Sequence, residues 1–354
     1  GVRRFSQQLV LAPLTGALLL GLVDQLAQRA SPAAGDIPTG AVTALLSAPL
    51  LLIMLLRQQV SQRTPSAPHG GKLTPWRPAT LWLVLLLLVL GAVGSLWFNR
   101  QPPGAETADL LAFRWPRMLG ALCAGAMLAT AGVLIQRLTG NAMASPELLG
   151  ISSCAALAVL LSVFFISSTL SLFPAAMTGS LLAIAALFWF GRGSQFNATK
   201  LVLTGLCLTC LASALSMILM LSGDPRALML LNWSTGSTSA VTAGMALSAA
   251  ITLAILFPLT LLLQRWLTLL TLGQSTARSL GMALQRSHLL ILVLAAALTA
   301  AGTLLVGPLS FVGLIAPQLA WSLGARHLRR QLIMAALLGA LLMVLADWLG
   351  RNIA

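Results

Sequence analysis

Long apolar segments alternate with short polar ones along almost the whole chain. A bilayer core about 30 Å thick requires roughly 20 consecutive apolar residues per helix. The segments that predict membrane-spanning helices are 8–27, 38–56, 81–98, 117–136, 151–169, 172–190, 201–221, 241–263, 288–306, 308–322 and 331–350. The weakest of these eleven is 308–322, because it is short and contains two prolines. The pattern predicts an all-α, polytopic transmembrane helix bundle.

Composition supports lipid as the solvent of most of this surface. Of 354 residues, 58% are hydrophobic and 8% are charged, whereas soluble domains carry about 25% charged residues. So few charges cannot cover a water-facing surface of this size. Residues 58–79 differ from the rest, since Ser, Pro, Gly, Lys and Arg dominate there, and they predict a polar linker.

The formal net charge of +14 does not indicate nucleic acid binding, because the basic residues are scattered singly between apolar segments. It indicates the excess of Lys and Arg that membrane proteins show in cytoplasmic loops. With the linker in the cytoplasm and one crossing per segment, 15 of the 21 basic residues are cytoplasmic and Glu147 is the only acid there. The cytoplasmic set is Arg3, Arg4, Arg57, Arg63, Lys72, Arg77, Arg137, Arg192, Lys200, Arg265, Arg278, Arg286, Arg326, Arg329 and Arg330.

The two ends of the chain repeat each other. Residues 1–28 align without gaps on 324–351 at an offset of 323 positions, and the match includes Gly, Arg and Asp as well as Leu. Chance similarity between leucine-rich helices does not explain such matches. We expect two homologous copies in a longer protein: the last two spans of copy one at 1–57, the linker at 58–79, and copy two at 80–354 without its last helix. We expect the full-length chain to continue with a segment like 37–56.

Residues with catalytic or metal-binding potential are few. Cys207 and Cys210 form a C-x-x-C, which can be redox-active or half of a metal site. They lie within an apolar segment, so we interpret them as small packing residues. His69, His288 and His327 are far apart in sequence and are interpreted as solvated or interfacial rather than as a metal site. No phosphate-binding G-x-x-x-x-G-K-[ST] occurs, so an energy source must be another subunit and no enzyme activity is expected.

Four motifs contain polar, Gly or Pro residues that helix packing alone does not explain. RWPRMLGALCAGAMLATAGVLIQRLTGNAMASPELLGISS (114–153) joins closely spaced small residues, which let helices approach in lipid, to a Pro-containing polar turn. GDPRALMLLNWSTGS (223–237) predicts a short amphipathic helix at the outer mouth, or an ordinary loop. In GPLSFVGLIAPQLAWSLGARHLRRQL (307–332), two prolines break a span before a basic turn. IPTGAVTALLSAP (37–49) is a span with Gly and Pro, a type that packs around a pathway.

Together these motifs resemble the FecCD-type permeases of ABC importers, and most closely the double-length type for ferric hydroxamate (ferrichrome-type) siderophores. The resemblance covers nearly all of 1–57 and 80–354. It implies ten helices per copy with both ends cytoplasmic, a location in the bacterial inner membrane and no cofactor. Copy two would then hold nine spans and the short helix near 226–233. The implied partners are a dimeric ABC ATPase, a periplasmic siderophore-binding protein, the ferric siderophore and membrane lipid.

The resemblance also implies roles for particular residues. Arginines on the outer face would receive carboxylates of the binding protein, although lipid-facing arginines at helix ends are an alternative. The residues for docking are Arg114, Arg117 and Arg351. In copy one, Gln28 takes the place of Arg351 with Arg29 beside it, so the pattern of the second docking point differs there. The residues for ATPase coupling are Gly324, Ala325, Arg326, His327, Arg329 and Arg330, with Gly1, Arg3 and Arg4 in copy one. Candidate pathway residues are Trp233, Ser234, Thr235, Ser237, Asn141 and Ser145.

Other functions, of the same class and of different classes, also have to be weighed against the sequence. The same family includes importers of vitamin B12 and haem. An ion-coupled secondary transporter is an alternative of another class, and it should place ionisable residues in the middle of spans. Asp24 and Asp347 instead lie near the outer helix ends, and the span centres carry no charge. An intramembrane enzyme lacks a plausible catalytic pair.

Overall fold

A computed structural model describes residues 76–97, 107–165, 172–192, 198–220, 236–309 and 311–353, with the isolated positions 14, 25, 49 and 53. Within these ranges all regular secondary structure is helical. The helices are α3 (Pro78–Trp97), α4 (Thr107–Thr139), α5 (Ile151–Phe165), α6 (Leu172–Arg192), α7 (Ala198–Met220), α9 (Ala243–Leu262), α10 (Gln264–Thr271), α11 (Gln274–Ser279), α12 (Leu284–Val306), α13 (Val312–Ser322) and α14 (Leu328–Ile353). Apart from those four isolated positions, the spans expected in 1–57 lie outside the described residues, and so does the short helix expected near 226–233.

Seven of the described helices are long and apolar enough to cross a membrane: α3, α4, α6, α7, α9, α12 and α14. The apolar α5 is shorter, with 15 residues. The expected span at 308–322 is wrong as a full crossing, because α13 has only 11 residues. At 1.5 Å per residue such a helix is roughly 16 Å long, about half of a bilayer core.

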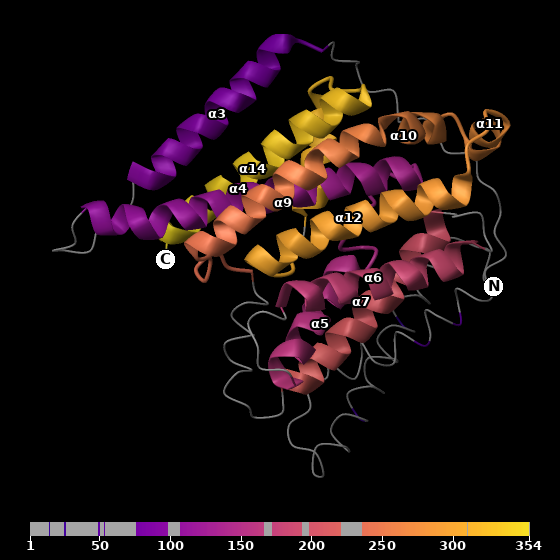
Figure 1. Cartoon of the computed structure of the whole chain (residues 1–354), viewed down its shortest axis with the longest axis horizontal. Coiled ribbons are helices and arrows are strands. Elements are labelled where there is room, and N and C mark those ends of the chain that lie inside the picture. Colours follow the sequence, from indigo (N-terminus) through magenta and orange to yellow (C-terminus); the bar gives the residue numbers. More distant parts are fainter. Residues whose placement is uncertain are drawn as a thin grey trace.

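Helix α4 lies at the centre of the bundle and packs against α14, α12, α9 and α13 (Figure 1). Helices α5, α6 and α7 form a second group that joins the first mainly through α12. In the most apolar 18-residue stretch of α4, 83% of the residues are buried. In the corresponding stretch of α3 only 17% are buried, because α3 packs against α14 on one side and exposes leucines on the other. Such an exposed apolar face is what lipid requires of a helix at the edge of a bundle.

Small residues bring α4 close to its neighbours, as the sequence predicts. A Cβ added at Gly132 would overlap the carbonyl group of Gly313 at the start of α13. The neighbouring Pro317 lies within α13 and has no N–H, so it cannot donate the usual helical hydrogen bond to Gly313. The carbonyl oxygen of Gly313 is therefore free of that bond where it meets α4. Without a side chain at Gly132, the two backbones can touch.

Two sequence expectations about prolines need correction. Helix α4 begins at Thr107, ten residues before the predicted start at 117, and continues through Pro116. Pro317 lies inside α13, so only the break at Gly307 and Pro308 interrupts the segment. A proline removes one helical hydrogen bond, and packing against neighbouring helices keeps the rest of the helix formed.

Candidate functional site

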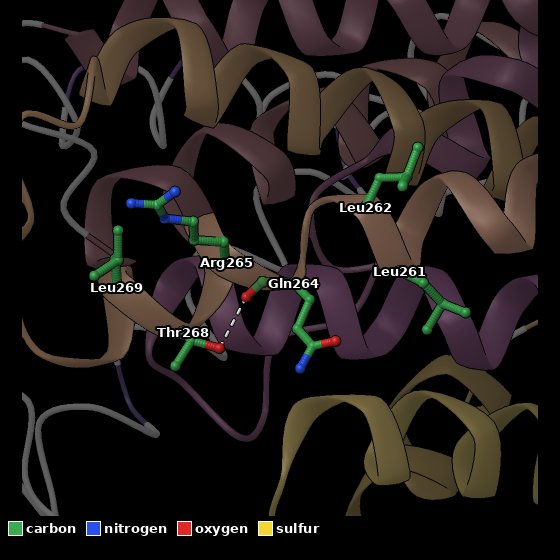
Figure 2. A pocket seen from close by; sticks show the side chains of 6 residues that line it. All are labelled: Leu261, Leu262, Gln264, Arg265, Thr268 and Leu269. Carbon is green, nitrogen blue, oxygen red and sulfur yellow. Dashed lines mark hydrogen bonds between the residues drawn. The ribbon is translucent and has the colours of Figure 1, made fainter.

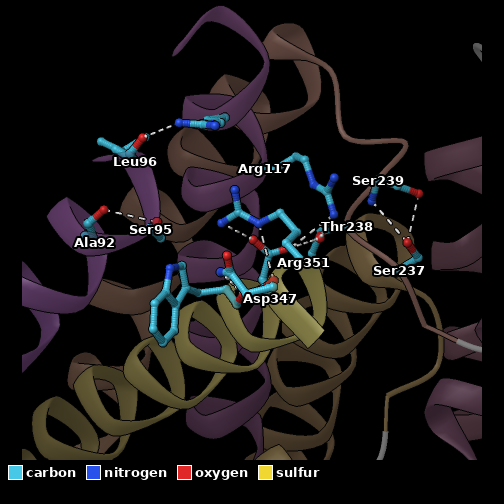
Figure 3. Close-up of polar contacts among 12 residues, drawn as sticks. Ala92, Ser95, Leu96, Arg117, Ser237, Thr238, Ser239, Asp347 and Arg351 are labelled. Carbon is cyan, nitrogen blue, oxygen red and sulfur yellow. Dashed lines mark hydrogen bonds and ion pairs between the residues drawn. The ribbon is translucent and has the colours of Figure 1, made fainter. Parts of the chain in front are cut away.

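An aspartate and two arginines form an ion-pair cluster at the end of the bundle where α14 finishes (Figure 3). Nη2 of Arg351 lies 2.8 Å from Oδ2 of Asp347, one helical turn away. Nη2 of Arg117, on α4, lies 3.4 Å from Oδ1 of the same carboxylate. The Asp347 side chain is only 3% exposed. We call Arg114, Arg117, Arg351 and Asp347 the arginine cluster.

Arg114 has a different partner. Its Nη1 donates a hydrogen bond of 3.0 Å to the carbonyl oxygen of Leu96, the penultimate residue of α3. The last carbonyls of a helix lack intrahelical donors, and a cation there complements the helix dipole. Arg114 therefore caps α3, and it has no carboxylate partner among the described residues. The arginine cluster contains three cations and one anion, so it is a positively charged surface.

The three residues predicted for docking are thus brought to one end of the bundle. The adjacent chain supplies further polar groups, because the Thr238 hydroxyl donates to Asp347 and the Ser237 hydroxyl donates to Ser239 at 2.8 Å. Sequence analysis placed Asp347 at a helix end but did not pair it with Arg117, which lies 230 positions away. Of the predicted pathway residues Ser237 lies here, while Trp233, Ser234 and Thr235 lie outside the described residues.

The opposite end of the bundle carries the basic turn, which we define as residues 322–331. It begins with a glycine C-cap: the N–H of Gly324 donates to the carbonyl of Trp321, and the N–H of Ala325 donates to that of Ala320. This is the Schellman pattern, and Gly324 has the left-handed φ of 88° that the pattern requires. Gly324 and Ala325 are buried, whereas His327, Arg329 and Arg330 are exposed. The equivalent residues Gly1, Arg3 and Arg4 lie outside the described residues.

The predicted pathway residues Asn141 and Ser145 lie in the turn between α4 and α5, residues 140–150, which we call the α4–α5 turn. Both stabilise the turn itself: Oδ1 of Asn141 accepts from the N–H of Met143, and Oγ of Ser145 accepts from that of Leu148. The turn follows Arg137 at the end of α4, and Arg137 contacts the basic turn. The structure therefore separates Asn141 and Ser145 from Ser237, which belongs to the other end of the bundle.

Glu147 is an acidic group in the α4–α5 turn that sequence analysis noted only for its sidedness. Both of its carboxylate oxygens are buried without a hydrogen-bond partner among the described residues. A Cβ added at Gly313 would lie 3.4 Å from Oε1. Burial raises the pKa of Glu147, and the nearby Ser145 hydroxyl and the backbone at Glu147 oppose that change to a smaller extent.

Two short helices, α10 and α11, follow α9 at the basic-turn end, and sequence analysis did not predict them. Helix α10 buries Leu267 and Leu270 and contacts α4 and α14. A hollow at the junction of α9 and α10 is lined by Leu261, Leu262, Gln264, Arg265, Thr268 and Leu269 (Figure 2). Short amphipathic helices escape a search for 20-residue apolar segments, although their 3.6-residue periodicity is a signal that could have found them.

The cysteines and His288 lie within helices and do not form a metal site among the described residues. None of the four cysteines forms a disulfide with another described residue, and Cys207 and Cys210 lie on α7. The expectation of a solvated His288 is wrong, because the residue lies near the start of α12 and is 1% exposed. Its Nδ1 makes a 2.7 Å contact with the carbonyl oxygen of Leu284 one turn earlier. No group of three His, Cys, Asp or Glu side chains gathers in the described part of the chain.

Comparison with known proteins gives this geometry a context. The family model of the FecCD transport family matches residues 79–354. The iron(3+)-hydroxamate import system permease protein FhuB of Escherichia coli K12 is 41% identical over 364 residues, which cover 100% of this chain and 55% of the relative. FhuB of Salmonella typhimurium is 43% identical over 367 residues, covering 99% of this chain and 53% of the relative. This chain spans about half the length of these curated relatives.

A solved structure is similar as well. A metal-chelate type ABC transporter in an inward-facing conformation superposes with a TM-score of 0.71 at 29% sequence identity. The match covers 78% of this chain and 92% of the transporter chain. The sequence relatives are permease proteins of import systems, and the similar solved structure is an ABC transporter, so the two comparisons agree.

Proposed function

This chain belongs to the FecCD transport family, and from this premise we propose that it is part of the permease of an ABC importer for ferric hydroxamate siderophores. The importer would lie in the bacterial inner membrane. The chain would provide a passive path, and a separate ATPase would supply the energy. Ligand and nucleotide can drive such a path only by binding its inward-open and outward-open states with different affinities.

The observation that carries this proposal is the extent of the similarity to the hydroxamate permeases. The FecCD family model matches only residues 79–354, but the match to FhuB of E. coli covers the whole chain. Residues 1–78 therefore also resemble that permease. This extent supports a division into the end of copy one at 1–57, a linker at 58–79 and copy two at 80–354. It also favours hydroxamate chelates over vitamin B12 or haem as substrates.

The arginine cluster supports docking of a siderophore-binding protein. It pairs Arg117 and Arg351 with one buried carboxylate and adds Arg114, which binds the end of α3, at the end of the bundle away from the basic turn. Such an excess of positive charge on the outer side runs against the usual distribution of Lys and Arg in membrane proteins. Complementary carboxylates on a delivering protein would explain it, since charge complementarity sets orientation and association rate.

The basic-turn end supports contact with the ATPase. The exposed His327, Arg329 and Arg330 of the basic turn lie at the same end as α10, with its exposed Arg265. These side chains lie on the basic turn, which joins α13 to α14, and on α10, which packs against α4 and α14. A partner that displaces the basic turn or α10 would therefore move these helices. An ion-coupled secondary transporter remains the rival mechanism. It differs from this proposal in that it transports without an ATPase.

Uptake measurements test the proposal directly. Cells that lack their own hydroxamate permease would express the complete transporter and receive ⁵⁵Fe bound to a hydroxamate, a catecholate or citrate, or labelled cobalamin. We expect uptake of the hydroxamate chelate alone, and only when the ATPase and the binding protein are present. Uptake of cobalamin instead would favour the B12 alternative. Uptake that persists without the ATPase would favour an ion-coupled transporter.

A further inference from the structure

One arginine near the end of α4 holds three other segments together. Nε of Arg137 donates a 2.8 Å hydrogen bond to Oε1 of Gln331, at the start of α14. Its Nη2 donates another of 2.8 Å to the carbonyl oxygen of Arg326, in the basic turn. Its guanidinium also lies over the ring of Trp321 in α13, 5.1 Å from the ring centroid. Arg137 thus links α4 to α13, the basic turn and α14.

The surroundings make this contact specific for arginine. Gln331 is 3% exposed, so its amide oxygen takes its hydrogen bond in a site largely closed to water. A guanidinium is planar, presents donors in fixed directions and stacks on aromatic rings, and lysine reproduces only its charge. A cation at the cytoplasmic end of a span needs only water or lipid phosphate to be stable. The two acceptors and the ring around Arg137 therefore indicate a role beyond charge.

The contact extends along the whole of α13. Nε2 of Gln136 donates to the carbonyl oxygen of Leu314 at 3.3 Å, near the start of α13. Nε2 of Gln318 donates to that of Ala142 at 2.6 Å, in the α4–α5 turn. Together with the backbone contact between Gly132 and Gly313, these bonds fix α13 to the last two turns of α4 and to the turn that follows.

The α4–α5 turn also contacts α7. A Cβ added at Gly150 would lie 2.8 Å from the carbonyl oxygen of Gly205. The Thr209 hydroxyl lies between two acceptors, the carbonyl oxygens of Gly205 at 3.0 Å and of Glu147 at 3.3 Å. A continuous set of contacts thus runs from the basic turn through Arg137 and the α4–α5 turn to the middle of α7. Contiguity alone does not demonstrate coupling, so an experiment must separate the two.

We propose that Arg137 is a positioning residue that makes the basic turn, α13 and the α4–α5 turn move as one body during the transport cycle. The proposal rests on the proposed function, because it assigns this body to the response to the ATPase. Without Arg137 the basic turn moves independently of α4. A displacement of the basic turn by the ATPase is then no longer transmitted to the α4–α5 turn, which contacts α7.

The first test compares Arg137→Gln with Arg192→Gln in the complete transporter. Arg192 is a suitable control because it also lies over a tryptophan at a helix end, 4.1 Å from the ring of Trp189, but within its own helix α6. We expect Arg137→Gln to lower siderophore uptake per ATP hydrolysed by about 5- to 150-fold, the usual range for coupling between two sites. Arg137→Lys should fail to restore it. Binding-protein affinity and the Arg192→Gln variant should stay within about twofold of wild type.

The second test measures movement directly. Spin labels at Ala142→Cys and Ser322→Cys, in a background without the four native cysteines, report the distance between the α4–α5 turn and the basic turn. With Arg137 present, we expect one narrow distance distribution that nucleotide does not change. With Arg137→Gln, we expect a distribution that broadens and shifts when nucleotide binds. A nucleotide-independent distance in Arg137→Gln, or uptake per ATP within twofold of wild type, would overturn the proposal.

A second variant keeps the test valid if the first does not fold. If Arg137→Gln does not accumulate in the membrane, Gln331→Leu replaces it, because that variant removes one acceptor and keeps the guanidinium. Normal coupling in Gln331→Leu, or loss of both variants from the membrane, would overturn the positioning role. Failure of the wild-type transporter to take up any ferric hydroxamate would instead contradict the proposed function, while the label distances would still test whether the segments move together.

Discussion

The backbones of Gly125 in α4 and Gly339 in α14 are in direct contact, and a Cβ added to either glycine would overlap the carbonyl group of the other. Glycine is required on both sides, because one methyl group on either helix would push the two apart. Gly339 also belongs to the repeat, where its counterpart is Gly16, which lies outside the described residues. This contact brings Arg117 of α4 within ion-pair distance of Asp347 of α14.

Gly125→Leu should therefore destabilise the bundle. Overpacking of a closely packed interior costs about 1–3 kcal/mol, and we expect a lower thermal midpoint for the purified permease and less protein in the membrane. Gly94→Leu in α3 is the matched control, since no atom lies within 4 Å of a Cβ added there and the side chain meets open space. Equal midpoints for Gly125→Leu and wild type would contradict the close contact.

Asp347→Asn should also destabilise the protein. The carboxylate pairs with both Arg117 and Arg351, whose side chains are 28% and 14% exposed. Leaving a buried polar group without its partner costs about 1–3 kcal/mol, and more for a charged group. Thermal unfolding in detergent measures the loss. The double variant Asp347→Asn/Arg351→Gln should recover part of it, and a double variant no more stable than the single one would argue against a shared ion pair.

Arg114→Glu should weaken association with the siderophore-binding protein. A single exposed ion pair contributes roughly 0.2–1 kcal/mol, and the reversed charge adds repulsion. The defect should shrink in 1 M salt, where the Debye length is about 3 Å. Affinity for the permease in nanodiscs, at low and high salt, measures this. Arg192→Glu, at the end of α6, controls for a general charge effect. Equal affinities of Arg114→Glu and wild type at low salt would leave Arg114 only as the cap of α3.

Gly324→Val should uncouple transport, whereas Gly324→Asn should be tolerated. Gly324 has a φ of 88°. Left-handed backbone costs an ordinary residue about 1–2 kcal/mol, and asparagine tolerates it better than a β-branched residue. The measurements are ferric hydroxamate uptake and co-purification with the ATPase. Full uptake in Gly324→Val would show that the C-cap of α13 does not matter for coupling.

Glu147→Gln should change how stability depends on pH. Burial raises the pKa of Glu147 in the folded state, so its contribution to stability is present below the unfolded pKa and is lost as pH rises through the folded pKa. Wild type should therefore lose stability relative to Glu147→Gln over a pH range that begins near the ordinary glutamate pKa of about 4.3 and extends upward. The two thermal midpoints should converge at the acidic end of that range. Parallel pH profiles would contradict a buried, unpaired carboxyl group.

Most of the fold could be predicted from the sequence. Lipid gives a backbone few stable choices, so an apolar segment of sufficient length has to be a helix. The ends of the long helices accordingly lie within a few residues of the predictions for α6, α7, α9 and α14. The opposite positions of Arg114 and Arg326 also followed from counting charges, since sidedness depends on how Lys and Arg are distributed among the loops along the sequence. The early start of α4, the half-length α13 and the short α10 did not follow, because prolines and short amphipathic segments depend on their neighbours.

By itself, the sequence determined the helical class, most of the spans among the described residues, the repeat and the separation of charge between the two ends. Only the tertiary structure decided which side chains meet. Asp347 accepts from an arginine 230 positions away, and Arg137 donates to residues 189 and 194 positions away. Such pairs leave no periodic signal in a single sequence, because they depend on how closely helices approach. That approach is set by glycines such as Gly125 and Gly132, whose partners become known only when the helices are packed.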